Sequence, residues 1–225
     1  MLNNFEENEN KFYGALKYIH LFFLSNIYFA ISNILLLCAI VFFELSFYNI
    51  LIYFIPLVLL GPSLSALISL YSKFLYFDKD IVITNTFFEA YKSNFINSLK
   101  VWIPSLCILC LITFDFLIVR SNDSLLILSI PLFFLLIIDI LFMIYSLIFI
   151  SKYEITFLNT LKLSLLSITK RPFTPIINFI IILLCIFILI FSKSIISLFI
   201  VGFSFFLILK SLKSTFLFIE NTYLK

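Results

Sequence analysis

Long apolar stretches alternate with short polar segments along most of this 225-residue chain. A helix that crosses the hydrocarbon core of a bilayer needs about 20 predominantly apolar residues. The pattern predicts an all-α fold, a polytopic membrane helix bundle of about six transmembrane helices in a single domain. If the last two stretches merge into one long tilted helix, the count falls to five. The expected spans cover residues 21–43, 48–71, 101–119, 125–150, 176–191 and 194–209.

The positive charges indicate how the chain would be oriented. A six-span topology with a cytoplasmic N-terminus puts all but two of the 15 Lys and Arg residues in cytoplasmic segments, the exceptions being Arg120 and Lys193. Such a bias is typical of cytoplasmic loops. It predicts a cytoplasmic N-terminal segment (1–20) and a cytoplasmic tail (210–225). A five-span topology would weaken the bias by moving the C-terminal lysines outside.

Two polar segments between spans, 72–100 and 151–175, are predicted to be cytoplasmic loops that each contain an amphipathic helix. In the first, Thr86 and Glu89 have the spacing of a capping box, and Ser151 and Glu154 repeat it in the second. Aromatic and polar residues then alternate at helical spacing in the first segment. The apolar face would hold Phe87, Phe88, Tyr91, Phe95 and Leu99, and the polar face Glu89, Lys92, Asn94 and Asn97. Both helices are expected to lie in the membrane interface or to pack under the bundle.

Composition narrows the range of functions. Hydrophobic residues make up 63% of the chain and charged residues 12%, against about 25% charged in soluble domains. Only 3 glycines are present and the net charge is +3, which argues against phosphate-binding loops and nucleic-acid binding. No G-x-S-x-G, H-E-x-x-H or Cys/His pair occurs. The Cys107/Cys110 pair lies in an apolar run without further ligands nearby, so we expect no enzyme, cofactor or metal site.

Asp139 is the most informative residue, because it lies in the middle of the fourth expected span. A charged side chain at that depth costs about 2.5–3.5 kcal/mol on insertion scales. It is therefore either a proton or substrate site, or a structural hydrogen-bonding residue between helices. The expected partners, depending on packing, are Asn33, Asn178, Ser129 and Ser146.

Asp115 is a second candidate polar site, in the outer third of the third span. Arg120 follows five residues later, which is not the same helix face, so a direct ion pair is not expected. Asp115 and Asp139 are expected to differ in depth by about 6–12 Å, so they should not form a carboxylate dyad.

A glycine and a proline interrupt the second span at Gly61 and Pro62, where a bend is expected. The run from Gly61 to Leu67, followed by the run from Thr86 to Phe95, resembles the YesL-like family of bacterial membrane proteins. The positions that carry the resemblance are Gly61, Pro62, Ala66, Phe88, Tyr91 and Phe95. The resemblance implies a bacterial cell membrane location, an undefined activity, and an association with carbohydrate-uptake systems of low-GC Gram-positive bacteria.

These observations favour a non-enzymatic accessory component of carbohydrate uptake or of cell-surface sugar handling. The expected partners are the lipid bilayer and a carbohydrate ABC transporter or another membrane protein, contacted by the two loop helices. The alternative is a small proton- or solute-conducting transporter or channel that uses Asp139.

Overall fold

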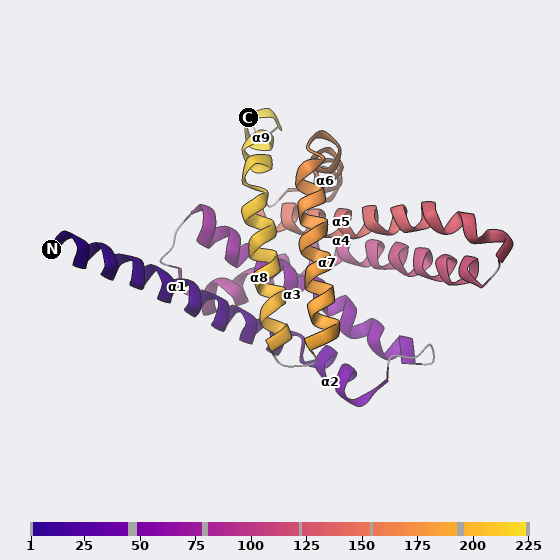
Figure 1. Ribbon diagram of the computed structural model, residues 1–225, viewed down its shortest axis with the longest axis horizontal. Helices are drawn as coiled ribbons and strands as arrows, with labels where there is room; N and C mark the ends of the chain where they lie inside the picture. Colours follow the sequence, from indigo (N-terminus) through magenta and orange to yellow (C-terminus); the bar gives the residue numbers. More distant parts are fainter. Residues whose placement is uncertain are drawn as a thin grey trace.

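The protein is α-helical throughout the part of the chain that the computed structural model describes, residues 2–44, 49–77, 81–121, 123–153, 155–192 and 196–223. These residues form nine α-helices and one short 3-10 helix, and they contain no strand, which confirms the all-α prediction (Figure 1). The helices are α1 (Leu2–Ser32), α2 (Ile34–Phe42), α3 (Ile50–Tyr76), α4 (Ile83–Arg120), η2 (Asp123–Leu128), α5 (Ser129–Tyr153), α6 (Phe157–Lys170), α7 (Phe173–Ser192), α8 (Ile196–Ser211) and α9 (Lys213–Tyr223).

Four helical stretches are long and apolar enough to cross a membrane by themselves: Tyr13–Ser32, Ile52–Tyr76, Ile83–Arg120 and Leu125–Tyr153. Two further spans are possible if each of two bent helix pairs counts as one. The pair α6 and α7 bends by 100°, and the pair α8 and α9 bends by 49°. The chain is therefore built as a membrane protein with four to six spans, and the predicted number is the upper end of that range.

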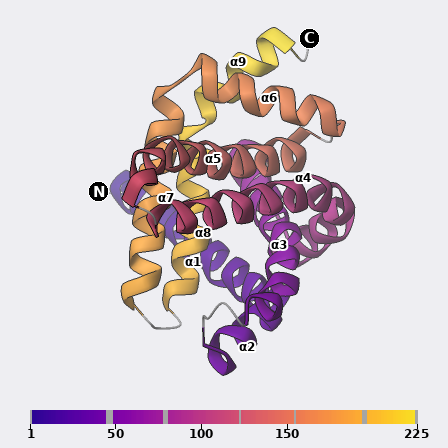
Figure 2. The same cartoon turned by 90° about the vertical axis from the view of Figure 1, so that its right-hand side faces the viewer.

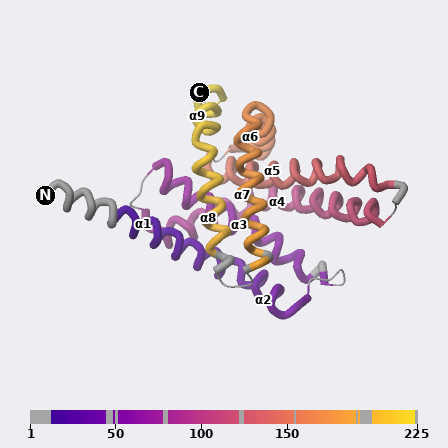
Figure 3. Tube along the Cα trace, viewed as in Figure 1, coloured from indigo at the N-terminus to yellow at the C-terminus, as the bar shows by residue number. Residues whose placement is uncertain are grey.

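Two pairs of helices cross each other steeply. In both Figure 1 and Figure 2, α4 lies beside α5 and α7 lies beside α8, and the second pair runs across the first. Transmembrane helices tilt on average by about 20° from the bilayer normal, so a crossing this steep is unusual between helices that all span a bilayer. The helices α7 and α8 correspond to the last two expected spans, 176–191 and 194–209, and Lys193 between them lies outside the described residues. Figure 3 traces this path from α1 to α9.

The first expected span is divided in the structure. Helix α1 ends at Ser32, and α2 begins after Asn33, whose φ of −110° and ψ of 24° are not helical. The Asn33 amide donates hydrogen bonds to the carbonyl of Phe29 (2.8 Å) and to the Ser63 hydroxyl (2.8 Å). Asparagine side chains compete in this way with regular helix hydrogen bonding.

The first loop helix is not a separate element, which corrects the expectation for residues 72–100. Helix α4 continues without a break for 38 residues from Ile83 to Arg120, and Pro104 lies inside it. At 1.5 Å per residue it is about 57 Å long, nearly twice the hydrocarbon thickness, so only part of it can cross a bilayer. The second loop helix, by contrast, is present as α6.

Neither expected capping box forms. Thr86 lies inside α4, which begins after Val82, and Ser151 lies inside α5, which extends to Tyr153. Glu154 lies outside the described residues. The residue before α6 is Thr156, and its side chain makes no capping hydrogen bond. Both helices therefore start at other positions than their capping signals suggested.

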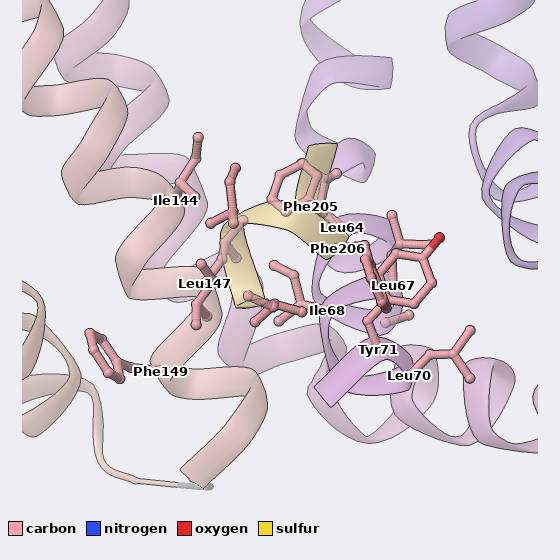
Figure 4. Packing of buried hydrophobic residues seen from close by; sticks show 14 of the residues in the cluster. Leu64, Leu67, Ile68, Leu70, Tyr71, Ile144, Leu147, Phe149, Phe205 and Phe206 are labelled. Carbon is pink, nitrogen blue, oxygen red and sulfur yellow. The ribbon is translucent and has the colours of Figure 1, made fainter. Parts of the chain in front are cut away.

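Helix α3 is the centre of the fold. Every residue from Gly61 to Ser72 is buried. Its apolar side chains, including Leu64, Leu67 and Ile68, pack against residues of α5 and α8 such as Leu147 and Phe206 (Figure 4). Small residues alternate with these large ones along α3, and small residues allow helix backbones to approach closely in membranes.

Candidate functional site

A polar cleft of about 510 Å³ opens between α3, α4 and α5. It lies where α3 and α5 end and near the beginning of α4, because Lys73 and Lys152 belong to the last turns of α3 and α5. Most of the residues that line it have hydroxyl, amide or charged side chains, and the others are Phe77, Ile81 and Ala90. The polar lining residues are Ser69, Ser72, Lys73, Glu89, Ser93, Asn94, Ser151 and Lys152.

Hydrogen bonds between the three helices build the closed side of this cleft. The Asn94 amide donates to the Ser69 hydroxyl (3.0 Å), and the Ser69 hydroxyl donates to the Ser151 carbonyl (3.1 Å). The hydroxyls of Ser65 and Ser151 form a hydrogen bond of 2.7 Å. All four residues are buried. The backbone and side chains of α3, α4 and α5 are therefore fixed at this point by contacts with one another.

Asn94 was expected on the exposed polar face of its helix, and that expectation is wrong. The buried face of α4 here contains Phe87, Ala90, Asn94 and Ser98, whereas Phe88 is exposed. The reason is the partner surface: α3 presents hydroxyl groups to α4, and an amide satisfies them where an aromatic ring would not.

Two charged groups of the cleft remain available to a ligand. The nearby Ser72 hydroxyl has no hydrogen-bond partner among the described residues, but it is buried and almost inaccessible. Lys73 and Glu89 are both exposed at the cleft, and neither has an ion-pair partner among the described residues. Ser93 makes only a long hydrogen bond, 3.4 Å, to the carbonyl of Ala90. Among the described residues, the cleft thus offers one cation and one carboxylate that lack an ion-pair partner.

The second lysine of the cleft, Lys152, is already satisfied. Its ammonium lies 3.0 Å from the Glu220 carboxylate and 2.9 Å from the Tyr153 hydroxyl. It also lies over the rings of Phe216 (3.8 Å to the centroid) and Tyr76 (4.8 Å). These contacts hold α9 against α5 and α3, and they make Lys152 a structural residue at the edge of the cleft.

The residues that carry the family resemblance are mostly packing residues. Trp102 of α4 lies on Gly61, and its indole N–H donates to the carbonyl of Leu57, 2.8 Å away. Pro62 lies within the continuous helix α3, and Ala66 is fully buried in the core.

The aromatic motif positions lie on α4. Phe88 contacts the ring of Tyr28 at 5.3 Å between centroids, and Tyr91 contacts Phe95 at 5.7 Å. Tyr28 also pairs through its hydroxyl with Thr84 at 2.7 Å, so this region joins α4 to α1.

Asp139 is buried in α5, and its Oδ2 has no hydrogen-bond partner in the part of the chain that the structure describes. The expected partners bond elsewhere: Asn33 to Ser63, Asn178 to Tyr145 and Ser211, Ser129 to Leu126, and Ser146 to Ser164. Asp139 therefore does not join two helices by hydrogen bonds in this structure.

Asp115 is exposed on α4 and borders a groove of about 370 Å³ between α4 and α5. The other residues of this groove are apolar, among them Val119, Leu132 and Leu135. Asp139 is four residues beyond Leu135, so it lies about 6 Å farther along α5. The structure places the two carboxyl groups in different surroundings, one exposed and one buried.

A third cavity, of about 340 Å³, is almost wholly apolar and is lined by residues of α1, α2, α3, α4, α5, α7 and α8. Leu64, Trp102, Ile144 and Phe205 contribute to it. Asp139 lines none of these three cavities.

Sequence reasoning missed the polar cleft, because its residues come from three helices. One signal was available in α3. Gly61, Ser65 and Ser69 recur at intervals of four, which is the small-residue spacing of closely packed membrane helices. That spacing would have identified the face of α3 that meets α4 and α5.

Comparison with known proteins adds one relationship. No curated protein and no solved structure matches the chain. A similarity to one protein family covers less than half of the chain. The segment that it covers contains the residues of α3 and α4 that line the polar cleft, and also Trp102 and Gly61. Residues 18–116 are similar to a family described as "Protein of unknown function, DUF624".

Proposed function

We propose that this chain is a non-enzymatic membrane protein that accompanies a carbohydrate-uptake system or a system for handling cell-surface sugars. The observation that supports this proposal best concerns the end of the α4–α5 hairpin that lies farthest from the polar cleft. This end of the hairpin extends away from the other helices (Figure 1). Apolar side chains on it, such as Leu111, Phe114 and Phe133, are exposed. Within the most apolar 18 residues of the stretch Leu125–Tyr153, 11% of the residues are buried. The corresponding value for the stretch Ile52–Tyr76 in α3 is 61%.

Asp115 and its groove distinguish this hairpin from an ordinary lipid-facing surface. Lipid can cover the apolar side chains at no cost, but an exposed carboxyl group at membrane depth is unfavourable. Asp115 is five residues from the end of α4, or about 7.5 Å along the helix axis. A transmembrane helix with a hydrogen-bond donor or a cation at that level would fill the groove and satisfy the carboxyl group.

The hairpin replaces the loop helices as the proposed contact surface. Residues 83–100 pack against α3 and contribute to the fold, so they are less free to bind a partner. The carbohydrate part of the proposal rests on the resemblance of residues 61–100 to the YesL-like family. Those residues lie within the segment that is similar to the DUF624 family.

In-membrane crosslinking would test the proposal. A photoreactive amino acid is placed at Phe114 on the hairpin, or at the exposed Phe173 of α7 as a control site. The tagged protein is then purified from its native membranes. We expect a permease subunit of a carbohydrate transporter to be crosslinked from position 114 and not from position 173.

Matched variants make this test specific. Asp115→Leu should abolish the crosslink, whereas Thr113→Val should preserve it, because the Thr113 hydroxyl bonds only to carbonyls of its own helix. Recovery of an uncrosslinked monomer alone would overturn the partner proposal. A partner without any role in carbohydrate transport would overturn the carbohydrate assignment.

A conduit that uses Asp139 is the second candidate function. The buried Oδ2 without a partner supports it, because polar groups inside a membrane span often mark an ion or proton path. Its burial outside the three cavities makes it the weaker candidate. Proton uptake into liposomes that contain the purified protein, compared with Asp139→Asn, is the measurement. Equal rates for both proteins and for empty liposomes would eliminate it.

A further inference from the structure

The apolar cavity of about 340 Å³ is formed by the segments best suited to the hydrocarbon core of a bilayer. Each of the four helical stretches that could span a membrane alone contributes to its lining, with Phe29 in α1, Leu64 in α3, Trp102 in α4 and Ile144 in α5. Helices α2, α7 and α8 contribute as well. A ligand in this cavity would therefore lie at the depth of the lipid tails.

The cavity leaves no side-chain hydrogen bond to be made by a ligand. The lining residues with hydrogen-bonding side chains are Asn33, Trp102, Cys185 and Ser204. Asn33 and Trp102 make the bonds to α1 and α3 described above. The Ser204 hydroxyl donates to the Val201 carbonyl (2.8 Å) and lies 3.5 Å from the Cys185 sulfur. A buried water needs about two to four polar partners, so the cavity favours an apolar occupant over water.

No charged side chain lines the cavity among the described residues. Glu44 follows the lining residue Ile40 by four positions, but it is not part of the lining. Lys193 follows the lining residue Leu189 by four positions, and it lies outside the described residues. A hydrocarbon chain needs neither charge, whereas the carboxylate of a free fatty acid would need a cation.

The cavity also reaches the surface of the protein. Ile40 of α2 and Ile186 of α7 line it and are exposed, by 56% and 42%. Trp102 in the same lining is buried. Other exposed residues of α2 and α7, such as Val41 and Phe187, are apolar, so lipid would surround this opening. The bilayer itself is therefore the source of an apolar occupant.

The size of the cavity suits a chain. An apolar cavity of about 150 Å³ holds one benzene molecule, so a cavity of about 340 Å³ has room for a chain of about twelve carbon atoms. One phenylalanine side chain of a partner protein would leave much of it empty. We infer that the cavity holds one acyl chain of a bilayer phospholipid, which enters beside α2 and α7. The lining stabilises the chain by dispersion contacts, and the headgroup stays outside. This inference goes beyond the proposed function and does not depend on the membrane partner.

Trp102 provides the measurement, because it is the only tryptophan of the chain and lines the cavity. The full-length protein is reconstituted into phosphatidylcholine vesicles whose acyl chains carry bromine, which quenches tryptophan fluorescence at short range. Vesicles of the same lipid without bromine are the reference. We expect most of the fluorescence to be lost in the brominated vesicles, although the 3% exposure of Trp102 leaves it almost no contact with lipid outside the protein.

Filling the cavity after folding separates a bound chain from the surrounding lipid. Cys38→Ser, Cys107→Ser and Cys110→Ser together leave Cys185 as the only thiol, and it is alkylated with N-cyclohexylmaleimide in detergent before reconstitution. The cyclohexyl group then occupies the cavity, so the fluorescence in brominated vesicles should return close to that of the reference. The control protein keeps Cys110 in place of Cys185. Because Cys110 is exposed on α4 and outside the cavity, its alkylation should leave the quenching unchanged.

A brominated fatty acid, added to unbrominated vesicles at equal bromine content, tests the source of the chain. It should quench Trp102 less than the brominated phospholipid does, and stronger quenching by the free acid would overturn the phospholipid assignment. Unquenched Trp102 in brominated phospholipid would show an empty cavity, and quenching that survives alkylation of Cys185 would come from the surrounding lipid. A Cys185 that does not react would show that other side chains of the protein close the cavity. Each of these three results overturns the inference.

Discussion

The indole ring of Trp102 lies directly against Gly61, where a side chain would normally separate two helices. A Cβ atom added to Gly61 would be 2.5 Å from Trp102 Cγ and 2.9 Å from Trp102 Cβ. The contact involves the base of the tryptophan side chain and not its flexible end. The indole N–H also donates to the carbonyl of Leu57, so the same side chain ties α4 to the backbone of α3.

We therefore expect Gly61→Ala to destabilise the protein by about 1–3 kcal/mol, because α4 must move away from α3. Heating the detergent-purified protein and measuring the surviving monodisperse fraction by size-exclusion chromatography gives the change in melting temperature. Gly14→Ala is the control, because a Cβ at Gly14 meets nothing within 4 Å. It should be neutral or slightly stabilising, since alanine is the better helix former. Equal stability of both variants would contradict the close contact.

The hydrogen bond between Asn94 and Ser69 should contribute modestly to stability. Interhelical hydrogen bonds in membrane proteins contribute about 0.6 kcal/mol on average and at most about 1.7 kcal/mol. Asn94→Ala and Ser69→Ala, separately and together, form a double-mutant cycle that measures the coupling between them. We expect a coupling energy in that range, measured by reversible unfolding in a denaturing detergent. The exposed Asn97, combined with Ser69→Ala in the same way, should show none.

The apolar pattern was sufficient to predict the class of fold, but not where helices begin and end. The change at Lys100 from an amphipathic stretch to an apolar one marked a loop boundary in the sequence. It is only a change in side-chain polarity, because the backbone of α4 continues through it. Conversely, α1 ends at Ser32 inside an apolar run, and the hydrogen bonds of the next residue, Asn33, to Phe29 and Ser63 show why.

The polar cleft was beyond sequence reasoning for a different reason. Ser69 and Ser151 are 82 residues apart in the chain, and Asn94 lies between them on a third helix. Local spacing can assign a residue to a face of its own helix, but it does not show which helix that face meets. Asn94 is a polar residue, as the face assignment requires, but it is buried. It is buried because the face of α3 that it meets is polar as well.

The ion pair between Lys152 and Glu220 should be necessary for holding α9 in place. Lys152 has a side-chain exposure of 5%, whereas Glu220 has 42%. Glu220→Gln leaves the lysine buried without its counter-charge, which should cost about 1–3 kcal/mol. Hydrogen–deuterium exchange should show faster exchange in α9 and little change in α3. The control is Lys213→Gln, an exposed charge change on α9 itself, which should not alter exchange. Uniform protection in both variants would show that α9 is held by Phe216 and Ile219 alone.

Asp139 provides the sharpest test of whether a buried carboxyl group serves structure or function. Its Oδ2 has no partner, so it does not stabilise the packing of α4 and α5 in this structure. Asp139→Leu should raise the melting temperature, because an apolar side chain of similar size removes a buried unsatisfied group worth about 1–3 kcal/mol. Asp115→Leu, the same change at an exposed carboxyl group, should leave the melting temperature of the purified protein in detergent unchanged.

If Asp139→Leu instead destabilises the protein, the carboxyl group makes a stabilising interaction with a water or ion that the protein requires. A gain in stability together with unchanged growth would indicate that the carboxyl group is dispensable. A gain in stability that is accompanied by lost function would mean that the chain retains an unfavourable group for its activity, as residues at functional sites often do.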